Sequence, residues 1–510
     1  MTARAPSYRW IRAGDLNAFF GLALDNMTQL VILSSLLIGL FKFPADLVLL
    51  RMVPGTAVGV LVGDLVYTWL AFRLARRSGR DDVTAMPFGI DTPSLFGIVF
   101  GVLGPVMLVT RDPMLAWKVG MGVTVVMGLC KLGLAFGGEW VRRVTPRAGL
   151  LGSIAGVAIL LIAFLPALKV FADPLVGLTA LVIIVVALVG GIRLPWGLPG
   201  AFVAVAAGAL IFWLREWLGW GGPVHPVGAI ALRLALPWPT GEWLGVLDQV
   251  WRYLPVALPF AVATVIGGID NTESAIAAGD EYRTRDILLT EAFATMAAGV
   301  CGGVIQNTPY IGHPAYKAMG ARAGYTLATG LVIGLGSALG LMSLLVGVLP
   351  EAAVAPILIF VGLQITAQAF GSSPARHAPA VAMAFLPVIA TLVLIQLNGV
   401  LSGLGRSAAD LAGEAGAAYQ ALLVLGNGFI LSALLWGAAV AFIIDRRLRL
   451  AGAAFACASL ATLFGLIHSP LPTGALFFPW SVDSAVPGAL AGAYGVVAWL
   501  CWLLSLREEA

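Results

Sequence analysis

Long runs of apolar residues, separated by short polar segments, follow one another along nearly the whole chain. A helix that crosses a membrane needs roughly 20 mostly apolar residues, and the chain contains about sixteen stretches of this kind. The pattern therefore predicts an all-α polytopic membrane protein. We expect the spans near residues 17–40, 53–75, 84–110, 115–137, 148–172, 174–192, 196–217, 252–279, 285–303, 304–328, 326–349, 352–370, 377–398, 417–444, 450–468 and 486–506.

The composition agrees with this pattern and excludes other classes of protein. Hydrophobic residues make up 60% of the 510 residues and charged residues only 11%, with a mean hydropathy of +0.95. A soluble domain carries about 25% charged residues, so this chain cannot cover a water-facing surface. The net charge is only +4 and the basic residues form short clusters between apolar runs, which argues against a nucleic acid as partner.

The four cysteines lie far apart without CxxC spacing, so neither a disulfide framework nor a zinc site fits them. We expect no metal site and no cofactor. The first residues are polar and basic, and the apolar run after them contains Asp25 and Asn26, so we expect the first span to be retained rather than cleaved as a signal peptide.

The distribution of basic residues predicts the orientation. If the N-terminus is cytoplasmic and the spans alternate, most of the 30 lysines and arginines fall in cytoplasmic segments, as the positive-inside rule requires. The sequence therefore predicts an integral membrane protein of the bacterial inner (plasma) membrane with both termini in the cytoplasm.

A faint internal repeat appears at polar positions inside the apolar runs. Asp25-Asn26 in the first span matches Asp270-Asn271 in the eighth, and two spans later Asp91-Thr92-Pro93 matches Asn307-Thr308-Pro309. The copies are seven spans apart, and an odd number of spans turns the second copy upside down. Transporters built from such inverted repeats bind substrate where interrupted helices of the two halves meet.

The Thr-Pro sequences predict where spans 3 and 10 are broken. Proline lacks the amide hydrogen and disfavours helix in the residue before it, but it is favourable in the first turn of a helix. Asp91, Asn307 or the following threonine can then cap a half-helix that begins inside the membrane. The residues before each break would be extended, and the two extended stretches could pair with each other.

The buried acids are the first candidates for function. A charge at the bilayer centre costs roughly 2.5–3.5 kcal/mol on insertion scales, so each acid needs a compensating role. We expect Asp270 and Glu273 to bind substrate or a coupling proton, and Asp25 and Asp91 to take part in the same site. The alternative is that these acids cap half-helices or join spans through hydrogen bonds, a role that fits Asp91 best.

A second group of candidates surrounds the second break. Gln306, Asn307, Thr308 and Tyr310 form a polar and aromatic cluster, and amides can both donate and accept, as a ring with N–H and C=O groups requires. The alternative is that they seal the broken helix. His313 could titrate near neutrality and couple transport to protons, or it could be an ordinary packed histidine.

Three residues near the first copy of the repeat complete the predicted substrate site. Asn26 and Thr92 belong to its polar blocks, and Phe88 directly precedes the break. The ring of Phe88 could stack on a planar ligand, although an aromatic residue at such a position is more often packing.

At these same residues the chain resembles the xanthine/uracil permease family of nucleobase–cation symporters, nearest its hypoxanthine/guanine permease branch. The best stretch runs from Thr308 to His313 and on through Gly320-Ala321-Arg322-Ala323-Gly324, and looks like the tenth-span Thr-Tyr-Ile-Glu-Ser pattern and the Gly-x-Arg-x-Gly turn of that branch. The eighth-span acid of the family falls on Asp270, whereas its tenth-span glutamate falls on Gly312. Loss of that glutamate leaves substrate and proton coupling open.

The resemblance implies a 7+7 inverted-repeat transporter with a core domain (spans 1–4 and 8–11), a gate domain (spans 5–7 and 12–14) and an elevator-like motion between them. It also implies a homodimer. Two extra C-terminal spans depart from the usual fourteen. The expected division is a first repeat at 15–217, an extracytoplasmic connection at 218–251, a second repeat at 252–445 and two additional spans at 446–510.

The sequence thus predicts a secondary active transporter of a nucleobase or purine-like small heterocycle, driven by protons or sodium and surrounded by membrane lipid. One alternative is an anion transporter on the same architecture. A remote alternative is an intramembrane enzyme in which Asp91 and Asp270 share a proton. No Walker-type loop is present, which argues against direct ATP drive.

Overall fold

The computed structural model describes residues 8–195, 198, 200–220, 234–341 and 350–508. Part of the expected connection at 218–251 and the end of the eleventh expected span fall outside the described residues. In these residues almost all regular structure is helical, and their single sheet has two three-residue strands. By length and composition, eight helical segments of the described chain can cross a membrane, or up to ten if two bent pairs count as one span each.

The expected all-α polytopic fold is confirmed, and within the described residues each expected span coincides with helix or with a strand followed by a helix. Fewer helices reach the length of a full span, and three apolar helices of the described chain are shorter, at Pro174–Val189, Gly324–Ala338 and Leu448–Leu463. The expected span at 417–444 is also interrupted. There α20 (Gly413–Gly426) and α21 (Phe429–Ile444) meet at an angle of 72°, next to Gly428 in the left-handed conformation.

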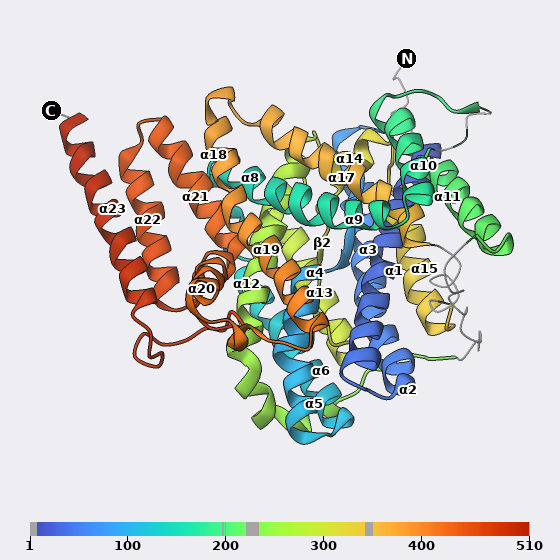
Figure 1. The fold of residues 1–510 in the computed structure, drawn as a ribbon. Helices are drawn as coiled ribbons and strands as arrows, with labels where there is room; N and C mark the ends of the chain where they lie inside the picture. Colours follow the sequence, from blue (N-terminus) through green and yellow to red (C-terminus); the bar gives the residue numbers. More distant parts are fainter. Residues whose placement is uncertain (1–7, 196–197, 199, 221–233, 342–349, 509–510) are drawn as a thin grey trace, which may run out of the picture.

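One set of helices packs around the two strands, and we call it the core group. Helix α3 lies against α13 and α15, α6 lies against α12 and α13, and α1 lies against α15. Figure 1 shows β2 and α4 near the centre of the molecule, among these helices. The core group comprises α1 (Ala13–Ser34), α3 (Val53–Ser78), α4 (Thr92–Ile98), α5 (Gly104–Thr110), α6 (Pro113–Leu134), α12 (Leu247–Ala277), α13 (Thr284–Val300), α14 (His313–Ala318) and α15 (Gly324–Ala338).

A second set, which we call the gate group, packs beside the first. Helix α17 lies against α8, α9, α10 and α11, and α21 lies against α8, α18 and α19. The gate group comprises α8 (Arg147–Val157), α9 (Phe164–Ala172), α10 (Pro174–Ile184), α11 (Gly200–Trp217), α17 (Glu351–Ser372), α18 (Ala378–Met383), α19 (Phe385–Gly403), α20 and α21. The short α7 (Gly138–Val144) leads from α6 to α8 and packs on α12 and α13.

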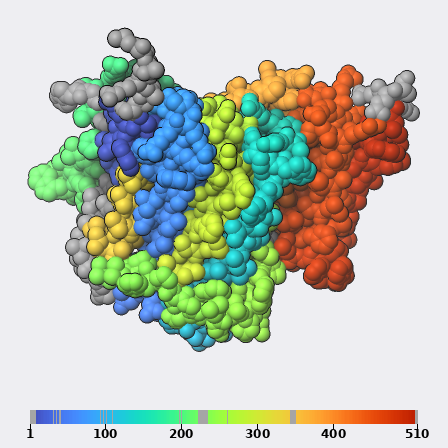
Figure 2. Space-filling view, turned by 180° about the vertical axis from the view of Figure 1, so that it is seen from behind, coloured from blue at the N-terminus to red at the C-terminus, as the bar shows by residue number. Residues whose placement is uncertain are grey.

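The last two helices extend the gate group at one edge. Helix α22 (Leu448–Leu463) packs on α21, and α23 (Val486–Glu508) packs on α22. Figure 2 shows this C-terminal part, coloured red, along one side of the molecule and away from the N-terminal helices. The two additional C-terminal helices are therefore peripheral to the strand pair.

Strands β1 (Phe88–Ile90) and β2 (Asn307–Pro309) pair antiparallel, with Gly89 opposite Thr308. Each strand precedes a helix, β1 before α4 and β2 before α14, so the two helices leave the pair at opposite ends. The predicted breaks in spans 3 and 10, and the predicted pairing of their extended stretches, are both present. The pairing satisfies backbone groups that lipid could not.

Candidate functional site

Each strand is held by an asparagine from the matching position of the repeat. The Asn26 side chain on α1 accepts from Ile90 N at 3.0 Å and donates to Phe88 O at 3.4 Å. The Asn271 side chain on α12 donates to Pro309 O at 2.8 Å. In each copy of the repeat, an asparagine at the same position thus anchors a strand. For Asn26 this anchoring is the structural alternative to the predicted substrate contact.

One face of the strand pair packs closely on α3. A Cβ atom added at Gly63 would overlap the ring of Phe88, and one added at Gly59 would overlap the side-chain amide of Asn307. Phe88 is fully buried and makes an edge-to-face contact with Tyr67, with the ring centroids 5.2 Å apart. The structure therefore gives Phe88 a packing role, and its ring has no face free for the predicted stacking on a substrate.

The threonines of the two Thr-Pro motifs are the accessible members of the breaks. Thr92 and Thr308 are half-buried, whereas Asp91, Gln306 and Asn307 are buried. Thr308 and the paired Gly89 lie on the strand face opposite to Phe88, and a Cβ at Gly89 would meet the Asn26 side chain. This face of the strand pair is directed toward α1.

The remaining predicted residues of the breaks are largely engaged within the protein. Asp91 Oδ2 accepts from Ser94 N at 3.0 Å, which caps α4 as the structural alternative proposed. The Gln306 amide donates to Phe260 O at 3.1 Å and accepts from Thr264. Tyr310 is buried beside Asp25, and its backbone N–H donates to Pro87 O at 2.8 Å, which extends the strand pairing.

The two acids predicted on α12 have different surroundings. Asp270 is fully buried, its Oδ2 contacts Ser153 Oγ of α8, and its Oδ1 has no hydrogen-bond partner among the described residues. Glu273 is paired with two arginines, at 2.8 Å from Arg142 and 2.6 Å from Arg147. In this conformation Glu273 is therefore part of an ion cluster and is not available to a substrate.

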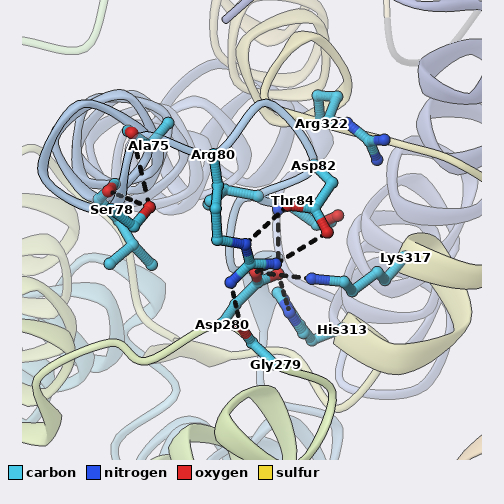
Figure 3. Close-up of polar contacts among 12 residues, drawn as sticks. Ala75, Ser78, Arg80, Asp82, Thr84, Gly279, Asp280, His313, Lys317 and Arg322 are labelled. Atoms are coloured by element: carbon cyan, nitrogen blue, oxygen red, sulfur yellow. Dashed lines mark hydrogen bonds and ion pairs between the residues drawn. The ribbon is translucent and has the colours of Figure 1, made fainter. Parts of the chain in front are cut away.

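His313, the first residue of α14, lies in a separate cluster of charged side chains around Asp280 (Figure 3). Asp280 itself lies in the turn between α12 and α13. The Asp280 carboxylate contacts Lys317 at 2.6 Å, His313 Nε2 at 3.1 Å and Arg80 at 3.3 Å. His313 Nδ1 lies 3.2 Å from Ala85 O, just before β1. The structure thus ties His313 to Asp280 and to the segment that enters β1, and its predicted role in proton coupling remains a prediction.

Burial alone would raise the pKa of Asp280. Hydrogen bonds from His313 and Lys317, together with the positive charge of Lys317, outweigh burial and hold the pKa of Asp280 below its usual value. The carboxylate is thereby kept ionised at the point where α12, α14 and the segment before β1 meet.

A buried ion pair beneath β2 was not predicted. Lys131 of α6 and Glu291 of α13 are both fully buried, with Nζ 2.8 Å from Oε1. Lys131 Nζ also donates to Asn307 O of β2 at 2.9 Å. The only signal in the sequence was a charged residue within each of two apolar runs, and nothing in the sequence shows that the two meet.

No protein-family model matches the chain, and no curated protein matches it. Among solved structures, the chain is similar to the transmembrane domain of a cyanobacterium bicarbonate transporter, BicA. The TM-score is 0.44 and the sequence identity 18%, over 77% of this chain and 97% of that chain.

Proposed function

We propose that this membrane protein is a secondary active transporter of a small polar solute, and that the solute binds beside the paired strands. The observation that carries the proposal is the pairing of two chain breaks, one from each copy of the sequence repeat, inside otherwise apolar stretches of sequence. Irregular backbone within a membrane protein is tolerated where it is buried or lines a cavity, and in inverted-repeat transporters it marks the substrate site.

One substrate class is a nucleobase or purine-like heterocycle carried with a proton. On α1 and α12, the buried polar atoms nearest the repeat motifs that have no hydrogen-bond partner in the described part of the chain are all acceptors. They are Asp25 Oδ2, Gln29 Oε1, Asp270 Oδ1 and Asn271 Oδ1. Acceptors require donors, such as the ring N–H groups of a heterocycle or a coupling cation. The resemblance at Thr308–His313 supports the same class.

The second substrate class is a small anion on the same architecture. The helices that follow β1 and β2 begin beside the strand pair, and the first amides of a helix favour an anion. At α14 no side chain caps these amides, because the N-cap residue is Gly312. At α4 the Asp91 carboxylate already occupies this place, which disfavours an anion there.

The geometry gives the enzyme alternative no support. Asp91 contacts the start of α4, whereas Asp270 contacts Ser153 of α8, and no contact in the described chain joins the two carboxyls. We propose the bacterial inner membrane as the location, with both termini cytoplasmic. In support, Figure 1 shows the start of the described chain and the end of α23 at the same end of the molecule.

The test is thermal stabilisation of the purified protein by a panel of purines, pyrimidines, related heterocycles and small anions. A ligand that binds the folded state raises the melting temperature by mass action, here by about a few degrees at saturating ligand. We expect Asp270→Asn to abolish the shift, and Asp248→Asn, in the first turn of the same helix, to retain it.

A shift with heterocycles alone would establish the first substrate class, and a shift with anions alone would establish the second. Absence of any shift, together with absence of uptake into proteoliposomes under proton and sodium gradients, would contradict the transport proposal.

A further inference from the structure

Three residues on one face of α12 are all bound by side chains outside the core group. Asp270, Glu273 and Ser274 stand at positions i, i+3 and i+4 and therefore lie side by side on the helix. Only the first of them is used by the proposed substrate site. The other two lie further along the same face, toward the end of α12.

The partners come from two helices of the gate group. Ser153 and Arg147 belong to α8, and they contact Asp270 and Glu273, respectively. Gln368 of α17 contacts Ser274 twice: its amide oxygen accepts from Ser274 Oγ at 2.6 Å, and its amide nitrogen donates to Ser274 O at 2.8 Å. Two separate gate helices thus hold one face of one core helix through polar contacts.

Glu273 is almost completely buried, with a side chain that is 4% exposed, so its charge depends on these partners. Arg142 belongs to α7, which packs on α12 and α13, so its contact with Glu273 does not reach the gate group. Arg147 is the first residue of α8, and its contact with Glu273 at 2.6 Å crosses to the gate group. Among these contacts between α12 and the gate group, the Arg147–Glu273 contact is thus the one between opposite charges, and it depends on the relative position of the core group and the gate group.

We propose that Arg147, Ser153 and Gln368 form a polar latch that holds α12 against the gate group in this conformation, and that the latch opens in each transport cycle. The inference rests on the proposed transport function. A shift of α12 along α8 by one helical turn, about 5.4 Å, breaks a contact of hydrogen-bond length. The substrate site and the latch are linked because Asp270 belongs to both: a solute that takes the Asp270 carboxylate competes with Ser153 for it.

The test measures the distance between the two groups directly. Spin labels are attached to cysteines at Ser78, at the end of α3, and at Ala375, between α17 and α18, both of which are exposed. The native cysteines are first replaced by serine. Double electron–electron resonance in liposomes then gives the distance distribution without any need for a known substrate.

Arg147→Gln is expected to add a second distance population that is absent from the parent protein. Arg143→Gln is the matched control, because Arg143 is 72% exposed and pairs with Glu139 within α7. This control should retain the parent distribution. Arg147→Lys, which keeps the charge, should restore most of the parent population if the Arg147→Gln effect is loss of the latch.

An unchanged distribution in Arg147→Gln would overturn the latch, and so would an equal change in Arg143→Gln. The transport proposal fails separately, through the absence of ligand shifts and uptake in the parent protein. A second distance population in Arg147→Gln together with no transport of any tested solute would keep the latch as a property of the fold while removing its proposed use.

Discussion

Lys131 Nζ lies 2.8 Å from Glu291 Oε1, and neither side chain is exposed at all. The same ammonium donates to Asn307 O, so the pair also supports β2. Charges in such a position are neutralised by each other and by hydrogen bonds, and the loss of one leaves the other uncompensated.

Lys131→Met is expected to lower the free energy of unfolding by about 3–5 kcal/mol, because Glu291 would remain buried without its partner. Lys131→Met combined with Glu291→Leu should recover most of this loss, yet transport should stay impaired because Asn307 O keeps only the hydrogen bond from Thr295 Oγ1 at 3.1 Å and loses the one from the ammonium. Thermal unfolding in detergent and uptake assays measure the two effects. Lys169→Met is the control: its pair with Glu351 is more than half exposed, and the expected change is under about 1 kcal/mol.

Gly59→Ala and Gly63→Ala on α3 are expected to destabilise the protein by about 1–3 kcal/mol and to impair transport. The added methyl groups would displace the side chains of Asn307 and Phe88, and with them the strand pair. Gly267→Ala on α12 is the matched control, since nothing lies within 4 Å of the added atom. It should be neutral or stabilising by about 0.5–1 kcal/mol. Equal effects at all three positions in melting experiments would contradict this account.

Asn26→Ala and Asn271→Ala are each expected to cost about 1–3 kcal/mol in the absence of any ligand, because each leaves a strand without its anchor. Thr28→Val on α1 removes only a hydrogen bond to Leu24 O within the helix and should have a much smaller effect. Melting temperatures of the ligand-free proteins measure these losses of stability. A normal melting temperature for Asn26→Ala together with lost ligand binding would instead favour the substrate contact that the sequence predicts.

Asp280→Asn is expected to show a pH-dependent loss of stability. The pKa of Asp280 is held below its usual value in the folded protein, so its ionised form stabilises the fold above about pH 4, the pKa of an unfolded aspartate. That contribution disappears as the pH falls through the lower pKa of the folded state.

The difference in melting temperature between the parent and Asp280→Asn should therefore be largest near neutrality and should shrink below about pH 4. Asp82→Asn is the control, because the Asp82 side chain is 49% exposed and pairs with Arg80 two residues away. Its effect should be small at every pH. A difference for Asp280→Asn that grows on acidification would contradict this explanation.

The sequence predicted the features that depend on local chemistry. A proline that follows a threonine inside an apolar run predicts a break in the membrane-spanning helix. Because this Thr-Pro pair occurs at both Pro93 and Pro309, the sequence predicted both breaks. The pairing of the two extended stretches followed because their backbone groups needed partners. The membrane class followed in the same way from apolar length and low charge.

The partners of charged side chains could not be predicted in this way. The sequence predicted that Glu273 binds substrate or a coupling proton and gave Arg147 no partner, although the structure pairs the two at 2.6 Å. The relation depends on how α8 packs on α12, more than 100 residues away in the chain. The sequence likewise does not distinguish polar side chains that bind a substrate from those that stabilise the fold. Asn26, for example, was predicted to contact substrate, and in the structure its side chain holds β1.

The pairing of β1 with β2 also has a consequence for biosynthesis. At about 5–20 residues per second, the roughly 220 residues between the two strands take on the order of 10–45 s to translate. Throughout that interval β1 has no partner strand, and its free backbone groups must be shielded from lipid by the insertion machinery, by water or by neighbouring helices. The first half of the chain is therefore committed to the membrane well before it can complete its own fold, and truncation ahead of Asn307 should leave it a target for membrane proteases.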